Sequence, residues 1–339
     1  MRQDALLYDT LLDEAVQCNL CSHRCLIRTG GRGICRVREN TGGKLYTLDY
    51  GNLIAANVDP VEKKPLYHFY PGSKAYSIAA PGCNFRCEWC QNWQISQMAQ
   101  EKALQNGLQV TPEKIVKMAL QAKCRSIAYT YTEPTIFFEY SYDTARLARH
   151  AGIKNIYVTN GFMTPEMLEM FNPYLDAVNV DIKAFKDETY RKLIGGRLEP
   201  VLESCRLMRK LGIWVEITTL IIPGINDDPD ELEGIARFIC EELGPNTPWH
   251  LSRFYPQYKM QDRNATDEAI LNETRAMGRA IGLHYVYLGN VVGPTNTYCR
   301  QCGHELISRM GYSIRLSGID VNGHCKICQT KLDGVGFVS

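Results

Sequence analysis

The segment Cys83-Asn84-Phe85-Arg86-Cys87-Glu88-Trp89-Cys90 places three cysteines within eight residues. It follows Ala75-Tyr76-Ser77-Ile78-Ala79-Ala80, a short apolar run that predicts a β-strand ending just before the thiols. A cubane iron–sulfur cluster normally takes four thiolates. Three leave one iron with an open coordination position, and an open position is what chemistry at a metal requires. We therefore interpret Cys83, Cys87 and Cys90 as ligands of a reactive [4Fe-4S] cluster.

The chain after residue 110 alternates between two hydrophobic patterns. Short apolar runs predict strands, and stretches of helical periodicity follow them. The helical stretches begin at caps such as Thr111-Pro112-Glu113 and end at glycines such as Gly152. The expected strands are 76–80, 126–130, 156–159, 177–182, 214–220, 249–254 and 285–288. This alternation predicts an α/β fold built on a parallel sheet.

Polar residues stand at the ends of nearly all these strands. Because ligands of parallel α/β barrels bind at the carboxyl ends of the strands, these residues are candidates for a binding site. They are the Cys83 loop, Thr132-Glu133-Pro134, Thr159-Asn160-Gly161, Asp181, Lys183 and segments 216–218 and 250–255. The alternative is that these residues are polar only because loops usually are. That alternative explains any single residue better than it explains the whole set.

The cysteine loop resembles the signature of the radical S-adenosylmethionine (SAM) superfamily. Its spacing is CxxxCxΦC, with Trp89 as the aromatic residue. The resemblance implies a partial (β/α)6-type TIM barrel, which we place over residues 51–290. It also implies an oxidoreductase in which a [4Fe-4S] cluster, reduced by one electron, cleaves SAM to a 5′-deoxyadenosyl radical that abstracts hydrogen from a substrate. The electron would come from a donor such as flavodoxin or ferredoxin.

The resemblance also gives roles to residues at the strand ends. Tyr131-Thr132-Glu133-Pro134 stands where the family has a motif that grips the methionine amino group, and Glu133 suits an ammonium. Asn155–Gly161 and Val178–Lys183 are similar to the strand ends of pyruvate formate-lyase activating enzymes, which carry DTNG and DLK there. Val158 departs from the Asp of DTNG. Lys183 would pair with the methionine carboxylate.

Segment 250–255 aligns with a later strand of the same enzymes. Tyr255 takes the place of their histidine, and His250 is an adjacent candidate for which a structural role is equally expected. No catalytic side chain is expected beyond the ligands of the cluster and of SAM. The cofactor-binding residues implied are Thr132, Glu133, Thr159, Asn160, Asp181, Lys183, His250 and Tyr255.

A second group of cysteines lies near the C-terminus, in residues 291–339. Its spacing, Cys299-x2-Cys302-x22-Cys325-x2-Cys328, is that of a zinc ribbon or a rubredoxin-like site. Four thiolates saturate a tetrahedral ion, so a structural site is predicted. We expect zinc, with mononuclear iron as the alternative.

A third group lies in a Cys-rich N-terminal segment, residues 1–50. Its spacing, Cys18-x2-Cys21-x3-Cys25-x9-Cys35, is less regular. We expect a closed metal site, with zinc and a second, auxiliary iron–sulfur cluster nearly equally supported, and a set of buried thiols as the weaker alternative. His23 inside this group is expected to be solvated.

Composition narrows the classes of function. The 339 residues carry a formal net charge of +1, which argues against a strongly basic nucleic-acid binder. No apolar run approaches the roughly 20 residues of a membrane span, and the acidic N-terminal stretch does not resemble a signal peptide. We therefore expect a cytoplasmic protein without membrane partners. In that reducing compartment, the 14 cysteines are expected as metal ligands rather than disulfides.

The chain resembles one subgroup, the radical SAM enzyme of the AmmeMemoRadiSam system. The resemblance rests on the cysteine-rich ends together with the segment Glu62-Lys63-Lys64-Pro65-Leu66-Tyr67-His68-Phe69. The resemblance implies AMMECR-like and Memo-like partners. Three functions compete: an enzyme acting on a protein or peptide, like an activase; a radical SAM enzyme that modifies a small molecule or RNA base; and a non-enzymatic zinc or electron-transfer protein. The near-neutral charge weakens the RNA version.

Overall fold

The protein is described by a computed structural model that covers residues 2–97, 104 and 107–337. Its centre is an eight-stranded sheet, and seven of the strands run parallel in chain order. These are β9 (Lys74–Ala79), β11 (Ser126–Tyr129), β12 (Lys154–Thr159), β13 (Ala177–Asp181), β14 (Trp214–Ile221), β15 (Trp249–Arg253) and β16 (Val286–Gly289). The predicted α/β fold is confirmed. The eighth strand, β8 (Ala55–Pro60), pairs antiparallel with β9 and was not expected.

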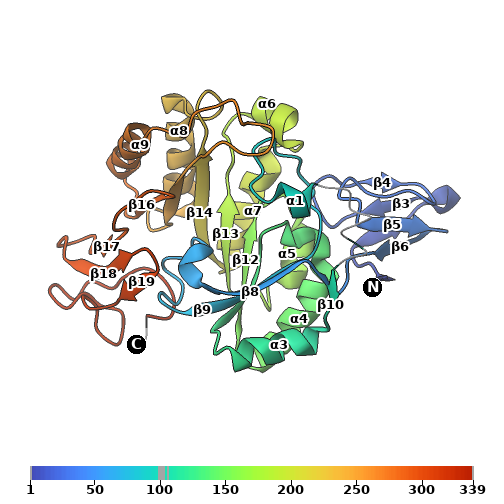
Figure 1. Cartoon of the computed structure of the whole chain (residues 1–339), viewed down its shortest axis with the longest axis horizontal. Helices are drawn as coiled ribbons and strands as arrows, with labels where there is room; N and C mark the ends of the chain where they lie inside the picture. Colours follow the sequence, from blue (N-terminus) through green and yellow to red (C-terminus); the bar gives the residue numbers. More distant parts are fainter. Residues whose placement is uncertain (1, 98–103, 105–106, 338–339) are drawn as a thin grey trace.

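Helices connect the parallel strands and pack along the sheet (Figure 1). They are α3 (Pro112–Gln121), α4 (Phe138–His150), α5 (Pro165–Phe171), α6 (Asp187–Thr189), α7 (Glu199–Lys210), α8 (Pro229–Arg237) and α9 (Glu268–Ile281). The Thr-Pro-Glu pattern caps α3 and α5 as predicted, because the Thr111 and Thr164 hydroxyls accept hydrogen bonds from the backbone N–H groups of Lys114 and Met167. Crossover helices of this kind leave the carboxyl ends of the seven parallel strands on one edge of the sheet.

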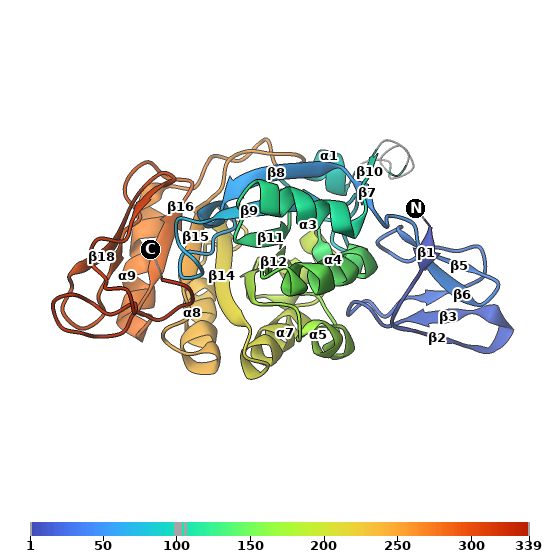
Figure 2. The ribbon, with the colours of Figure 1, turned by 90° about the horizontal axis from the view of Figure 1, so that it is seen from below.

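The N-terminal residues form two small antiparallel sheets at one end of the molecule (Figure 2). One contains β2 (Tyr8–Thr10), β3 (Val16–Cys18) and β4 (Leu26–Ile27), and the other β1 (Gln3–Asp4), β6 (Lys44–Thr47) and β5 (Arg38–Thr41). A buried ion pair between Arg38 and Glu139 of α4 joins them to the barrel. Breaking a buried pair of this kind leaves an uncompensated charge, so the contact specifies where these sheets dock.

The C-terminal residues form a third small sheet at the opposite end (Figures 1 and 2). It contains β17 (Thr297–Tyr298), β18 (Glu305–Met310) and β19 (Ser313–Arg315), and its apolar side chains form a cluster separate from the main core. The buried guanidinium of Arg309 donates to the Tyr67 carbonyl at 2.8 Å, which attaches the sheet to the barrel. The domain boundaries at residues 50 and 290 stay a prediction. Among the described residues, no helix combines the length and apolar character needed to cross a membrane.

Candidate active site

A cavity of about 660 Å³ opens at the carboxyl ends of the parallel strands. Its volume lies in the range of small-molecule and cofactor sites. The three cysteines of the loop after β9 line it, together with seven of the eight residues predicted to bind the cofactor: Thr132, Glu133, Thr159, Asn160, Asp181, Lys183 and His250. The structure therefore brings together the ends of four successive strands, β9, β11, β12 and β13, with His250 from β15.

The eighth residue, Tyr255, is not among the residues that line this cavity. Strand β15 ends at Arg253, and the Tyr255 side chain is 46% exposed, with its hydroxyl donating to the Asn290 carbonyl at 3.1 Å. Its expected position in the site is not the one observed, because the chain turns outward just beyond the end of the strand.

The cysteine loop holds its three thiols near one another but not in tight contact. Each pair of the three sulfurs interacts electrostatically. Among the described residues, these sulfurs do not belong to any set of three or more ligand atoms that all lie within 4.8 Å of one another. In the described part of the chain, the cysteine group near the C-terminus meets that condition. Burial raises the pKa of the Cys83 thiol well above its usual value and that of Cys87 to about 12. Both are protonated at neutral pH unless a metal displaces the proton.

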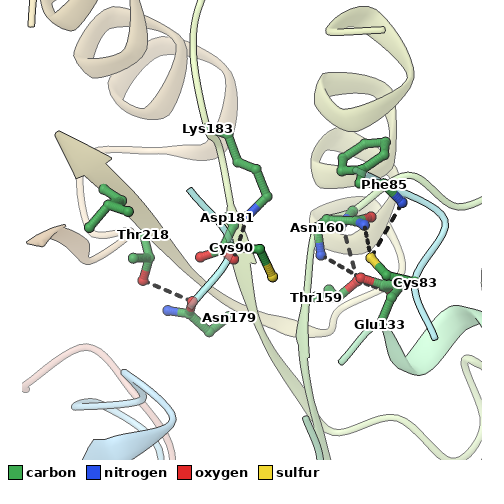
Figure 3. Close-up of polar contacts among 12 residues, drawn as sticks. Cys83, Phe85, Cys90, Glu133, Thr159, Asn160, Asn179, Asp181, Lys183 and Thr218 are labelled. Carbon is green, nitrogen blue, oxygen red and sulfur yellow. Dashed lines mark hydrogen bonds and ion pairs between the residues drawn. The ribbon is translucent and has the colours of Figure 1, made fainter. Parts of the chain in front are cut away.

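This spacing fits a polynuclear cluster better than a single ion. A cubane carries an iron at each ligated corner, so its thiolates lie further apart than thiolates sharing one ion. The Phe85 backbone N–H donates to the Cys83 sulfur at 3.3 Å, a contact of the type that tunes iron–sulfur clusters (Figure 3). The donor set and the room in the cavity both suit the group that the sequence predicts.

Glu133 links the ends of two neighbouring strands (Figure 3). Its Oε1 accepts from the Thr135 backbone N–H and hydroxyl and from the Thr159 hydroxyl, and its Oε2 accepts from the Asn160 backbone N–H. Burial raises the pKa of Glu133, although these hydrogen bonds oppose the shift. A carboxylate has about four acceptor sites, and three of these bonds fall on Oε1, so Oε2 keeps one site for a further donor.

Lys183 and Asp181 form an ion pair of 2.9 Å on the cavity wall (Figure 3). Burial lowers the pKa of Lys183, but Asp181 and the nearby Cys87 more than offset that effect, so the pKa is raised. The ammonium is therefore charged at neutral pH and has three donors, only one of which Asp181 takes.

His250 belongs to a buried polar network centred on Glu216. The Glu216 carboxylate accepts from the His250 ring at 2.7 Å, from the Trp214 indole at 3.0 Å, and from the backbone N–H groups of Tyr67 and His68. Burial disfavours its ionised form, yet the hydrogen bond and charge of His250 lead a set of contacts that lower the pKa of Glu216. His250 thus lines the cavity while it anchors the 67–68 backbone.

Two residues of the cavity wall, Lys64 and Tyr131, meet at Asp59 behind it, and this cluster was not predicted as a site. The buried Lys64 ammonium lies 2.7 Å from Asp59 and 4.4 Å from the centre of the Tyr131 ring, and the Tyr131 hydroxyl donates to the same carboxylate. Burial lowers the pKa of Lys64 to about 8, although Asp59 opposes the shift. In the sequence, Lys64 was noted only as part of the 62–69 segment that resembles the subgroup. No local sequence pattern indicates that residues 59, 64 and 131 meet.

The four C-terminal cysteines form a compact group. The ligand atoms of Cys299, Cys302, Cys325 and Cys328 all lie within 4.8 Å of one another. The sulfur–sulfur distances are 3.5 Å between Cys299 and Cys328 and 3.7 Å between Cys302 and Cys325. Four sulfurs at 2.3 Å from one tetrahedral ion would stand about 3.8 Å apart. The structure therefore has the single-ion geometry that the two CxxC knuckles predict.

The four N-terminal cysteines also come together. Cys18 ends β3, Cys25 precedes β4, and Cys35 precedes β5; Cys18, Cys21 and Cys35 are buried, and Cys25 is half-buried. The expectation that His23 is solvated is wrong. Its half-buried ring contacts the Asn84 carbonyl at 2.8 Å and packs against Phe162.

Comparison with known proteins agrees with this geometry. The Radical SAM superfamily matches residues 77–239 of the chain. This stretch contains the cysteine loop and the ends of β9 to β14. Residues 77–239 of the chain therefore form a radical SAM domain. Together with relatives named as activating enzymes, this match shows that the protein is an enzyme. The radical SAM superfamily uses a [4Fe-4S] cluster and SAM, which decides against the non-enzymatic alternative.

Two relatives extend the comparison. An uncharacterized protein of Methanocaldococcus jannaschii is 45% identical over 334 residues, covering 98% of this radical SAM enzyme and 99% of that protein. The pyruvate formate-lyase 1-activating enzyme of Escherichia coli K12 is 26% identical over 172 residues, covering 46% of this chain and 65% of that enzyme. Among solved structures, Streptococcus suis SuiB shares the fold with a TM-score of 0.50 and 12% identity, over 68% of this chain and 52% of that one.

Proposed function

We propose that this enzyme binds its reactive cluster through Cys83, Cys87 and Cys90 and binds SAM along the neighbouring strand ends. The observation that carries the proposal is that all three thiols and seven predicted SAM-binding residues line one cavity. When bound and reduced by one electron, such a cluster supplies the cleavage of SAM to methionine and a 5′-deoxyadenosyl radical, which abstracts a hydrogen atom from the substrate.

The residues of the chain would position SAM in this cavity. The remaining acceptor site on Glu133 suits the methionine ammonium, and the free donors of Lys183 suit the carboxylate. Thr159 and Asn160 act through Glu133, because their hydrogen bonds fix its orientation. Phe85 and Trp89 are buried beside the thiols, and they exclude water from the reacting centre.

We propose that the substrate is a protein or peptide, as for an activase. The support is the similarity to an enzyme named as an activator of pyruvate formate-lyase 1. A second support is the composition of the cavity wall, which includes Lys63 and the exposed Tyr312 from the turn of the C-terminal sheet. A wall that reaches the surface admits a segment of another chain.

The first experiment is anaerobic reconstitution with iron and sulfide, followed by SAM and dithionite, with 5′-deoxyadenosine measured. We expect the wild type to produce it, Cys87→Ala to fail, and Cys205→Ala, which changes a lone buried cysteine, to keep the activity. A wild type with a full, reducible cluster and bound SAM, but without deoxyadenosine, contradicts the proposed cleavage.

A second experiment distinguishes the substrate classes. Cell extract is dialysed, and the retained and diffusible fractions are added separately to the reconstituted enzyme with SAM and a ferredoxin or flavodoxin donor. Stimulation by the retained fraction that protease abolishes and nuclease does not abolish supports a protein substrate. Stimulation by the diffusible fraction, or sensitivity to nuclease, favours the small-molecule or RNA alternative.

We propose zinc for the C-terminal group, because its sulfur spacing is that of one closed tetrahedral ion. We also propose membership of the AmmeMemoRadiSam subgroup, with AMMECR-like and Memo-like partners. The support is the combination of the 62–69 segment with cysteine-rich groups at both ends. Co-purification of tagged enzyme with both proteins tests this assignment, and the absence of both from the source genome would contradict it.

A further inference from the structure

The N-terminal cysteines resemble the thiols of the active site in their spacing, not those of the C-terminal group. Each of the six pairs among Cys18, Cys21, Cys25 and Cys35 interacts electrostatically. Within the described ranges, however, these sulfurs do not meet the 4.8 Å condition that the C-terminal group meets. No three of these sulfurs lie mutually within 4.8 Å, so they stand further apart than thiolates around one tetrahedral ion, and a polynuclear cluster with an iron at each ligated corner accommodates such a separation.

The surroundings of these four sulfurs suit an anionic group. The buried Arg38 guanidinium lies 3.5 Å from the Cys18 sulfur through Nη1, and its Nε has no hydrogen-bond partner among the described residues. The backbone N–H groups of His23, Ile34 and Val37 favour the thiolate forms of Cys21, Cys25 and Cys35, respectively. Gly33 lies against two of the sulfurs, because a Cβ atom built on it would stand 3.7 Å from the Cys25 sulfur and 3.8 Å from the Cys35 sulfur.

One residue connects this group to the active-site loop. The His23 backbone N–H favours the Cys21 thiolate, and the His23 ring contacts the carbonyl oxygen of Asn84, the residue that follows Cys83. A carbonyl only accepts, so the ring Nε2 carries the proton in this contact.

Further contacts hold the two loops together. The Cys21 backbone bridges to Met163 beside the Asn160 loop, and the Ser22 hydroxyl donates to the Met163 carbonyl at 2.6 Å. Thr164 donates to the Asn19 carbonyl at 2.7 Å. The N-terminal group therefore lies directly against the loops that surround the active-site thiols. In Figure 1, the sheet that contains β3 and β4 lies beside the barrel.

We propose that Cys18, Cys21, Cys25 and Cys35 hold a second iron–sulfur cluster that relays electrons through His23 to the cluster at Cys83, Cys87 and Cys90. The relay rests on the proposed function, which requires one electron for each SAM cleaved. A low-potential protein donor of the ferredoxin or flavodoxin class gives one electron to the N-terminal cluster. That cluster is reoxidised as the active-site cluster is reduced, and no bond or proton changes.

The metal content tests the cluster without disturbing its own ligands. After anaerobic reconstitution, the wild type should hold about eight irons, and a Cys83→Ala, Cys87→Ala, Cys90→Ala triple variant should retain about four with matching sulfide. Retention of zinc alone, or of no metal, by the folded triple variant overturns the proposal. Reduced wild type should also show an electron paramagnetic resonance spectrum broadened by magnetic interaction between two clusters, and this broadening should disappear in the triple variant.

The relay is tested by the rate at which a reduced flavodoxin reduces the active-site cluster. His23→Ala should slow this step by about tenfold, the scale seen when groups just outside a metal's ligands are removed. Its iron content and SAM affinity should stay unchanged, and His150→Ala on the exposed side of α4 is the control. An unchanged rate overturns the relay. Deoxyadenosine production with dithionite is measured in parallel, so that failure of the active-site cluster is recognised separately.

Discussion

The Oε2 atom of Glu133 accepts a hydrogen bond of 2.8 Å from the backbone N–H of Asn160, which ties the end of β11 to the end of β12. The carboxylate is therefore a structural element of the site as well as its proposed ammonium acceptor. Both uses depend on a side chain that is 2% exposed and satisfied almost completely by its neighbours.

Replacement of Glu133 by Ala should lower both stability and SAM affinity. The change leaves the Asn160 N–H and the Thr159 hydroxyl without their buried acceptor, at a cost of about 1–3 kcal/mol for each unpaired group. Urea unfolding measures the first effect and equilibrium dialysis with SAM the second. Glu169→Ala on the exposed face of α5 is the control, and equal stabilities of the two variants would contradict the linking role.

Replacement of Lys183 by Met should weaken SAM binding by about tenfold or more, since a hydrogen bond to a charged group contributes about 1.5–3 kcal/mol. The iron content should not change. Lys183→Arg should keep part of the affinity because it keeps the charge. Lys192→Met, at an exposed ion pair with Glu188, serves as the matched control. Unchanged SAM binding by Lys183→Met would remove Lys183 from the site.

The C-terminal group should bind about one zinc per chain. Cys325→Ser should lose this zinc and loosen the packing around Arg309, whereas Cys205→Ser should keep both. Zinc is measured by elemental analysis, and the packing by amide hydrogen exchange of residues 297–310. Iron instead of zinc in protein isolated without reconstitution would favour the mononuclear iron alternative.

The free energy of unfolding should depend on pH through the protonation of His68. Its ring donates from Nδ1 to the Asp333 carbonyl and accepts at Nε2 from the Tyr287 hydroxyl, an arrangement that requires the neutral form. Burial lowers the pKa of His68 to about 4, against about 6.5 in the unfolded chain. Between these values the unfolded chain binds more protons, so the free energy of unfolding should fall, by up to about 3 kcal/mol, as the pH drops from 6.5 to 4.

Denaturation of the wild type and His68→Gln between pH 7.5 and 5 checks this expectation. The variant should be less stable at pH 7.5 but should lose less stability on acidification. His150→Gln, which changes an exposed histidine, should follow the wild type. Parallel pH profiles for wild type and His68→Gln would show that another group governs acid stability.

Local patterns were sufficient for the elements of the barrel. Strand β12 and helix α5 lie where the apolar run before Thr159 and the Thr164-Pro165-Glu166 cap predict them, because strand burial and helix capping depend on neighbours in sequence. The edge strand β8 was missed, since its exposed residues 56–58 lack an apolar pattern and its pairing with β9 is a tertiary contact.

Local sequence was enough to identify the residues that could carry the chemistry. Thiol spacing distinguished the three-cysteine loop from the two four-cysteine groups, and strand-end positions indicated the residues around them. Which of those residues meet depends on the tertiary structure. It excluded Tyr255 from the cavity, added Lys64 and Tyr131, which share Asp59 as a partner, and placed His23 between Cys21 and Asn84. Spacing and periodicity act over a few residues, whereas the pairing of the strands into one sheet and the docking of the N-terminal sheets set distances between residues far apart in the chain.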